Sequence, residues 1–168
     1  MSNRYFDALA HLDDKRVTSP IDYLKRAAKN GVHYILNTGV NPQQESSIQP
    51  LSILQTKGIP TLLSAFGLHP SHANTMDANR LLPTLEERIS TSPYPCVALG
   101  EIGLDRRLNQ PALETQLRVF TLQLEFTKAH GLPFIIHGVK STQIMLETLT
   151  KLGPYPRGGM WHSFGGPS

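Results

Sequence analysis

Short apolar runs along this chain alternate with segments whose apolar residues recur every three or four positions. Continuous apolar runs bounded by turn residues predict strands that are buried on both faces, and the periodic segments predict amphipathic helices. Strands that alternate with helices in this way are typical of βα units and a parallel sheet. The pattern therefore predicts an α/β fold with six βα repeats, the last without its helix. The predicted strands are 5–9, 34–37, 61–66, 96–99, 133–137 and 160–162.

Capping signals place the helices between these strands. The first helix is predicted to begin after Ser19, because Pro20 fits the first helical position, and to end at 30–31. A second helix is predicted over 41–58, and Pro50 inside it predicts a kink or a late start because proline removes a helical hydrogen bond. The apolar stripes of the other three helices are Leu81, Leu85 and Ile89; Leu113, Leu117, Phe120 and Leu124; and Ile144, Leu149 and Leu152.

Length and composition predict one soluble domain that covers residues 1–168, with 39% apolar and 17% charged residues. No apolar run is long enough to cross a bilayer, so no membrane partner is expected. The N-terminus leads straight into a strand without a leader, and the single cysteine, Cys96, cannot form an internal disulfide. The predicted compartment is the cytoplasm. The net charge of +3 is spread along the chain and does not by itself indicate nucleic acid.

Potential metal ligands fall where predicted strands end. The segment Gly-Glu-Ile-Gly-Leu-Asp at 100–105 follows a short apolar run, so two carboxylates are expected just past that strand. His11 and His69 follow the first and third strands, and His137 and His162 close the fifth and sixth. The carboxyl ends of parallel strands converge in a barrel, and imidazoles with a carboxylate are donors that zinc and related divalent ions prefer. A single histidine is more often a surface or core residue, but four at strand ends predict one shared site.

Four ordered motifs resemble the TatD family of metal-dependent hydrolases, often called TatD-type DNases. They are Gly-Leu-His-Pro at 67–70, the segment 100–105, Leu-Pro-Phe-Ile-Ile-His at 132–137 and His-Ser-Phe-Gly-Gly at 162–166. The resemblance covers essentially the whole chain. It implies a TIM-barrel hydrolase related to the amidohydrolases, with divalent metals (zinc, magnesium or manganese) at the strand ends and phosphodiester bonds of DNA as the usual substrate.

The resemblance also implies roles for individual residues. Glu101 would be a metal-bridging carboxylate, and His137 and His162 would be ligands of one metal. His11 would be the second histidine of the His-x-His pair that the family carries on its first strand. The candidate metal ligands are thus His11, Glu101, His137 and His162, and the candidate catalytic residues are Glu101 and His69.

The sequence departs from the family pattern at several positions. Leu9 stands where the first histidine of the pair is expected, so we expect one ion at Glu101 and a weaker or empty second site beside His11. Val139 replaces an arginine that would contact phosphate, with Lys140 or the pair 106–107 as candidate replacements. The family's later aspartate ligand is not reached. A complete barrel of this type has about 250 residues and eight strands, so six strands predict an incomplete barrel with two open edges and possible self-association.

Three functions stay open at this stage. The first is a metal-dependent hydrolase that acts on DNA or a small phosphoester through a metal-activated water. The second is a degenerate or truncated relative without catalysis, which binds at most a metal or a partner. The third is a metal-dependent amide hydrolase, which would use the same site.

Overall fold

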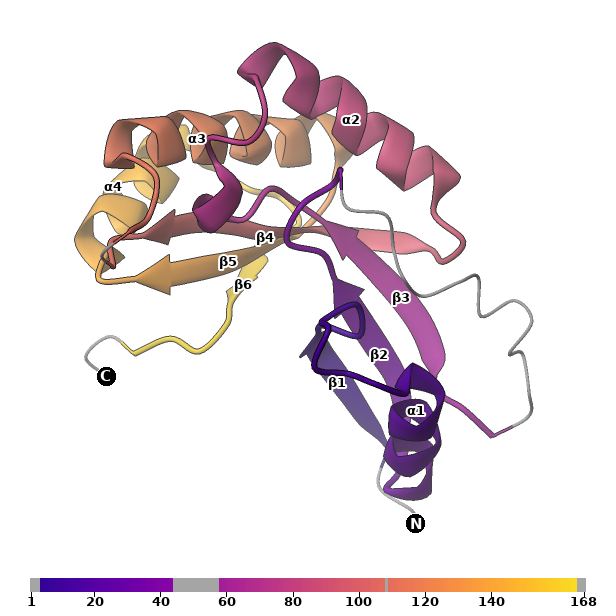
Figure 1. Ribbon diagram of the computed structural model, residues 1–168. Helices are drawn as coiled ribbons and strands as arrows, with labels where there is room; N and C mark the ends of the chain where they lie inside the picture. Colours follow the sequence, from indigo (N-terminus) through magenta and orange to yellow (C-terminus); the bar gives the residue numbers. More distant parts are fainter. Residues whose placement is uncertain (1–3, 44–57, 108, 166–168) are drawn as a thin grey trace.

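The computed structural model describes residues 4–43, 58–107 and 109–165. Within them, six parallel strands form one sheet in the order β1-β2-β3-β4-β5-β6. The sheet curls, so that β1–β3 turn away from β4–β6 as half of a barrel would (Figure 1). The α/β barrel-type fold with six strands is therefore confirmed. The strands are β1 (Tyr5–Ala10), β2 (Val32–Thr38), β3 (Thr61–Phe66), β4 (Cys96–Asp105), β5 (Phe134–Val139) and β6 (Gly159–Trp161).

The helices lie on the outer face of the curled sheet, with α1 beside β1 and β2, α2 beside β3, and α3 and α4 over β4 and β5 (Figure 1). The first helix begins at Pro20 as predicted. The Ser19 hydroxyl donates to the Asp22 carboxylate at 2.7 Å, and its oxygen accepts no hydrogen bond from the N–H groups of the first helical turn. The helix predicted over 41–58, with Pro50, lies outside the described residues from position 44 onward. The helical elements are α1 (Pro20–Lys29), η2 (Pro70–His72), α2 (Ala78–Thr91), α3 (Leu113–His130) and α4 (Thr142–Leu152).

The fourth strand is longer than the sequence indicated. We expected it to end at 99, with Glu101 and Asp105 in a following loop, but β4 continues through both carboxylates and pairs with β5 as far as Asp105. The reason is Gly103, whose φ is 137°. A Cβ atom there would lie 2.1 Å from the backbone oxygen of His137. The glycine is needed because it allows the close approach of two strands.

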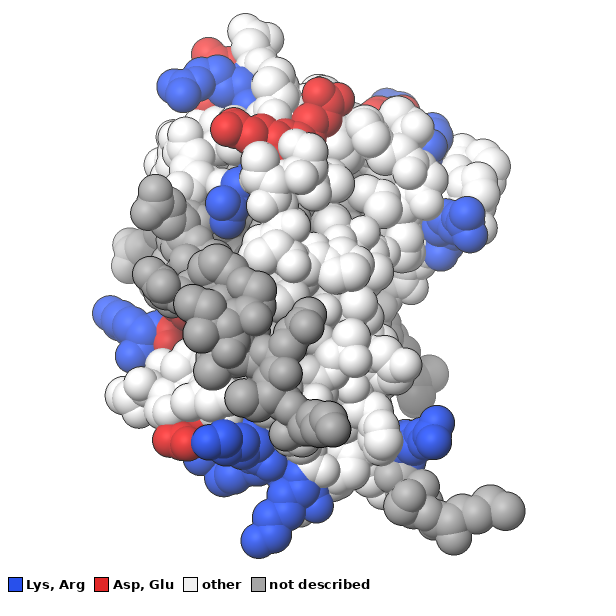
Figure 2. Space-filling model, turned by 90° about the vertical axis from the view of Figure 1, so that its right-hand side faces the viewer, with Lys and Arg blue, Asp and Glu red and all other residues white. Residues whose placement is uncertain are grey.

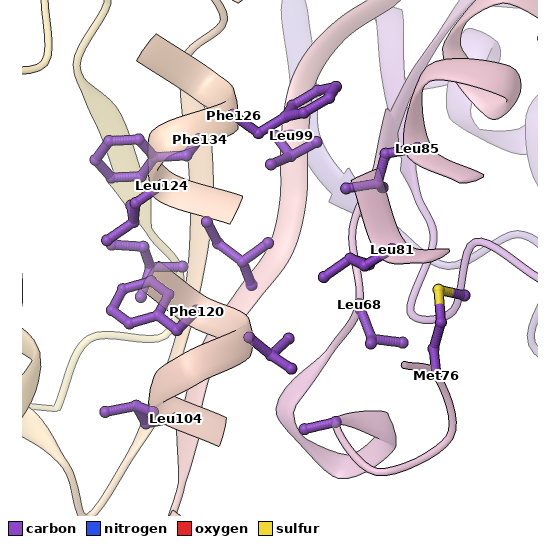
Figure 3. Packing of buried hydrophobic residues seen from close by; sticks show 14 of the residues in the cluster. Leu68, Met76, Leu81, Leu85, Leu99, Leu104, Phe120, Leu124, Phe126 and Phe134 are labelled. Carbon is purple, nitrogen blue, oxygen red and sulfur yellow. The ribbon is translucent and has the colours of Figure 1, made fainter. Parts of the chain in front are cut away.

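The main core lies between the sheet and helices α2, α3 and α4. Figure 3 shows Leu81 and Leu85 of α2 on the side of Leu68, and Phe120 and Leu124 of α3 on the side of Phe134, all within one cluster. A smaller cluster joins α1 to β1, β2 and β3. A third lies on the other face of the sheet and consists of Leu36, Ala65, Ala98 and Ile135, with Leu9, Leu63, Val97 and Met160 packed against them.

The first strand leaves apolar surface exposed at one edge of the sheet. Phe6 of β1 and Tyr34 of β2 are 51% and 50% exposed, and their rings meet edge to face with centroids 6.4 Å apart.

In Figure 2, lysines and arginines gather at the lower end of the molecule, at the height of α1 in Figure 1, while the described residues in the middle of this face carry little charge. In the described part of the chain, no helix has the length and apolar character that a bilayer span needs.

Candidate metal centre

The structure brings the five predicted site residues together around the Glu101 carboxylate. Glu101 lies within β4, His137 within β5, and His11, His69 and His162 lie in the residues that follow β1, β3 and β6. Glu101 is 2% exposed. Its Oε1 lies 3.1 Å from His162 Nε2 and 3.5 Å from His11 Nε2. Its Oε2 lies 3.6 Å from His69 Nε2 and 3.9 Å from His137 Nδ1.

Hydrogen bonds on the far side of two histidine rings fix which nitrogen faces the centre with a lone pair. His11 Nδ1 donates to the backbone oxygen of Thr38 at 2.8 Å, and His137 Nε2 donates to the Asp105 carboxylate at 3.1 Å. Both partners are acceptors, so the ring protons lie on these outer nitrogens. A neutral ring then points its other nitrogen, unprotonated, at Glu101. Such outer partners are the usual way in which a metal-binding histidine is oriented.

The spacing of the inner atoms fits one small cation. His137 Nδ1 and His162 Nε2 are 3.3 Å apart, and both face Glu101. Two ligands at the usual zinc–nitrogen distance in a tetrahedral site are separated by about 3.3–3.4 Å. The Oε1 atom of Glu101 is buried and accepts no well-aligned hydrogen bond. Imidazole nitrogens that converge on a buried carboxylate need a cation or a proton between them, so the donor set fits a divalent ion.

In His69 the ring proton lies on the nitrogen that faces the centre, the reverse of the arrangement in His11 and His137. Its Nδ1 accepts a hydrogen bond from the Ser71 backbone N–H at 3.1 Å, and the Ser71 hydroxyl lies 2.7 Å away. Burial, together with the nearby His137 ring, lowers the pKa of His69 to about 4, so the ring is neutral at pH 7. Its proton therefore lies on Nε2, which faces Glu101 as a donor. Ligand atoms of His69, Glu101 and His137 all lie within 4.8 Å of one another, but this hydrogen-bond pattern makes His69 a donor at the centre and not a ligand.

Electrostatics keep the central carboxylate ionised. Burial opposes the ionisation of Glu101, but the imidazoles of His11 and His162 outweigh it and lower the Glu101 pKa. Contact with Glu101 raises the pKa of His11, whereas burial lowers the pKa of His162. The Glu101 carboxylate is therefore ionised at neutral pH, as the binding of a divalent cation requires.

Asp105 supports the centre from behind His137. It is fully buried, and its carboxylate accepts hydrogen bonds from the guanidinium and the backbone N–H of Arg107. Burial opposes ionisation of Asp105, but Arg107 and His137 outweigh it and lower its pKa to about 2. Asp105 therefore stays charged and holds the His137 ring in the orientation described above.

A cavity of about 960 Å³ opens over the centre and includes His11, His69, Glu101, His137 and His162 in its lining. Lys15, Arg16 and Arg107 also line it. Arg107 is thus the candidate for the missing phosphate contact that lies at the cavity. The other two candidates, Arg106 and Lys140, are exposed, and the Arg106 guanidinium donates to the backbone oxygen of Lys140. Leu9 packs into the apolar cluster on the sheet face that does not carry the helices.

Some supporting residues had no distinctive signal in the sequence. The Thr38 backbone oxygen and the Ser71 backbone N–H act through the main chain, which residue type does not reveal. Gln116 and Gln123 are buried on the sheet-facing side of α3, although the apolar stripe predicted for that helix passes beside them. Their spacing of seven residues, which is about two helical turns, indicates that they lie on the same face of the helix, and this spacing can be read from the sequence.

The chain is similar to known proteins in sequence and in fold. The model of the family described as "TatD related DNase" matches residues 6–168. The uncharacterized metal-dependent hydrolase YjjV of Escherichia coli K12 is 29% identical over 164 residues, which are 97% of this chain and 61% of that protein. The 3'-5' ssDNA/RNA exonuclease TatD of Erwinia billingiae is 32% identical over 143 residues, 85% of this chain and 52% of that protein. The crystal structure of the Escherichia coli YjjV protein aligns with a TM-score of 0.81 and 27% identity, covering 99% of this chain and 62% of that one. The chain thus spans less than two thirds of these relatives.

Proposed function

Because the chain belongs to the family of TatD-related DNases, we propose that it is a metal-dependent hydrolase that cleaves phosphodiester bonds. The observation that carries this proposal is the convergence of imidazole nitrogens on the buried, unsatisfied Oε1 of Glu101. The names of the relatives as metal-dependent hydrolases and as an ssDNA/RNA exonuclease support it.

In this proposal one divalent ion, which is zinc, magnesium or manganese, is held by Glu101, His137 and His162. When bound, it supplies Lewis acidity and activates water for attack on a phosphoester. A second site beside His11 is weaker or empty, because Leu9 offers no ligand atom. The negative charge of Glu101 holds the cation, and its position among four imidazoles makes it the residue on which the chemistry depends.

Two further side chains act on the substrate in this proposal. The neutral His69 ring presents an N–H to the cavity and donates a hydrogen bond to an oxygen of the phosphate. Arg107 lines the same cavity, and its attachment to Asp105 orients the guanidinium before an anion arrives. DNA or a small phosphoester is the substrate class that this combination of a cation, a neutral donor and a guanidinium fits.

The remaining expectations are part of the same proposal. The chain self-associates through its open sheet edges, which is supported by the exposure of Phe6 and Tyr34 near the side of β1 that pairs with no other described strand. We place the protein in the cytoplasm, since Cys96 is its single cysteine. Leu9 favours one alternative, a relative that binds metal without catalysis, and an amide hydrolase would use the same site.

The test combines metal content with cleavage of DNA oligonucleotides and a model phosphodiester. Elemental analysis after dialysis should find one divalent ion per chain, and Glu101→Gln should abolish both binding and metal-dependent cleavage, because it removes the charge and nearly keeps the shape. Glu114→Gln, which changes an exposed glutamate in the first turn of α3, is the matched control and should leave both unchanged.

Leu9→His should raise the content of a second ion and the rate of cleavage, because it supplies an imidazole beside His11. Metal binding without cleavage of either phosphodiester would favour the non-catalytic relative, and cleavage of an amide substrate instead would favour the third function. Two tightly held ions in the unaltered chain would contradict an impaired second site. Cleavage that survives both a chelator and Glu101→Gln would overturn the proposal.

A further inference from the structure

Two buried glutamines on α3 each bond to the main chain of a segment that carries part of the centre. Gln116 and Gln123 are 2% and 0% exposed and lie on the sheet-facing side of the helix, beside Phe120 and Leu124. Leu68 and Leu104, which precede His69 and Asp105 in the chain, belong to the same core cluster as Phe120 and Leu124. Neither glutamine takes part in the arrangement of donors described above.

Gln123 binds both polar backbone groups of Leu68. Its Oε1 accepts from the Leu68 N–H at 2.7 Å, and its Nε2 donates to the Leu68 carbonyl oxygen at 3.1 Å. These are the two bonds that a neighbouring strand would make, here supplied by one side chain. Because Leu68 directly precedes His69, this pair of bonds fixes the backbone from which the His69 ring projects.

Gln116 does the same at the end of β4. Its Oε1 accepts from the Asp105 N–H at 2.7 Å, and its Nε2 donates to the Asp105 carbonyl oxygen at 2.9 Å and to that of Pro111 at 2.6 Å. The Asp105 carboxylate in turn accepts from His137. Gln116 thus holds the backbone of Asp105, the residue that orients the candidate metal ligand His137.

Burying a primary amide in an apolar helix interface is unfavourable unless its hydrogen bonds are made, and both side chains make bonds with their oxygen and their nitrogen. An apolar residue of similar size would fill the same space, so packing alone does not call for glutamine here. We propose that Gln116 and Gln123 are positioning residues: Gln123 sets the location of His69, and Gln116 sets that of Asp105 and, through it, the His137 ring. The roles of His69 and His137 rest on the proposed function.

We call each pair of hydrogen bonds from a glutamine to one residue's backbone N–H and carbonyl oxygen a clamp. Amide hydrogen exchange in the full, metal-free chain tests the two clamps without any measurement of activity. Gln123→Met should speed exchange of the Leu68 amide by about ten-fold or more and leave the Asp105 amide unchanged. Gln116→Met should have the reverse effect. Thr127→Val is the matched control, since Thr127 is buried on the same helix but its hydroxyl bonds to Leu124 within α3, and it should change neither amide.

Metal affinity and rate then separate the two roles. Gln116→Met should weaken binding of Zn²⁺ about ten-fold, because it loosens the partner of a ligand, whereas Gln123→Met should lower kcat and leave Zn²⁺ affinity unchanged. In the isosteric changes Gln116→Glu and Gln123→Glu, burial favours the protonated carboxyl, which keeps an acceptor oxygen and donates to the carbonyl, so they should preserve protection of the clamped amide and restore part of the lost function. They also keep the test valid if a methionine variant fails to fold.

Equal acceleration of both amides in each methionine variant would overturn the proposal, because it would mean that the glutamines support only the general stability of α3. Unchanged Zn²⁺ affinity in Gln116→Met, with selective exchange at Asp105, would overturn the link to His137. If the selective exchange is found but the unaltered chain has no hydrolase activity, the clamps stand and the proposed function fails.

Discussion

Asp105→Asn is the most informative single substitution at the centre. The carboxylate accepts from His137 Nε2 with one oxygen and from the Arg107 guanidinium with both. Asparagine has the same shape but a single acceptor oxygen. If that oxygen serves Arg107, the amide NH₂ faces His137 Nε2, and two donors meet. The ring then relieves the conflict by moving its proton to Nδ1, the nitrogen that faces Glu101, which removes a ligand lone pair.

The expected loss follows from this change of tautomer. Partners behind a metal-binding histidine contribute about 10- to 100-fold in metal affinity, or about 1.4–2.7 kcal/mol. Isothermal titration of the metal-free chain with Zn²⁺ measures it. Asp77→Asn is the matched control, because Asp77 accepts from the Asn79 N–H at 2.9 Å as the cap of α2, away from the centre. It should cost some stability and leave Zn²⁺ affinity unchanged.

The same substitution has a signature in the pH dependence of stability. The pKa of Asp105 is lowered from 3.8 to about 2, so its contribution to folding is fully present above pH 3.8 and is lost as the pH falls from 3.8 to 2. The shift corresponds to about 2 kcal/mol, which we reduce to about 1–2 kcal/mol because the Arg107 side chain is 55% exposed and water screens the pair. Urea denaturation of the metal-free proteins should therefore show the Asn variant less stable at pH 7, with the gap closing below pH 3.8. Zn²⁺ affinity equal to that of the unaltered chain would refute the role of Asp105, and a stability gap that does not change with pH would refute the electrostatic part of the argument.

Two further predictions concern the sheet. Gly103→Ala should destabilise the chain by more than about 2 kcal/mol and abolish metal binding, because the new Cβ would lie 2.1 Å from the backbone oxygen of His137; urea denaturation checks it against Gly165→Ala, where no atom lies within 4 Å. The 168-residue chain should not behave as a stable monomer, and Phe6→Lys beside Tyr34 should reduce its association. Light scattering at several concentrations decides this, and a monodisperse monomer with cooperative unfolding would show that the edges are already protected.

The places of the histidines could be predicted because strand ends converge in a parallel sheet, whatever the details of packing. His11, His69, His137 and His162 needed only a correct assignment of strands. The length of β4 could not be predicted, because Gly103 has the same appearance in a sequence whether it makes a turn or admits a neighbouring strand. The difference depends on the approach of β5, which is more than thirty positions away in the chain.

The direction of each imidazole was also beyond sequence reasoning. It depends on partners far along the chain, such as the Thr38 carbonyl oxygen, 27 positions from His11, and Asp105, 32 positions from His137. Residue type says that a ring can donate or accept, and the fold decides which nitrogen does so. The distinction between His69 as a donor and the other rings as ligands therefore needed three-dimensional contacts.

Glu101 and the four histidines around it come from five different strands or the segments that follow them, and positions 11 and 162 are near opposite ends of the described chain. An ion held between positions 101, 137 and 162 would act as a cross-link that exists only in the folded protein. Binding at 100 times the dissociation constant then stabilises the fold by about 2.7 kcal/mol, whatever the substrate is. The melting temperature, recorded across a panel of divalent ions, consequently identifies the preferred metal before any reaction has been found.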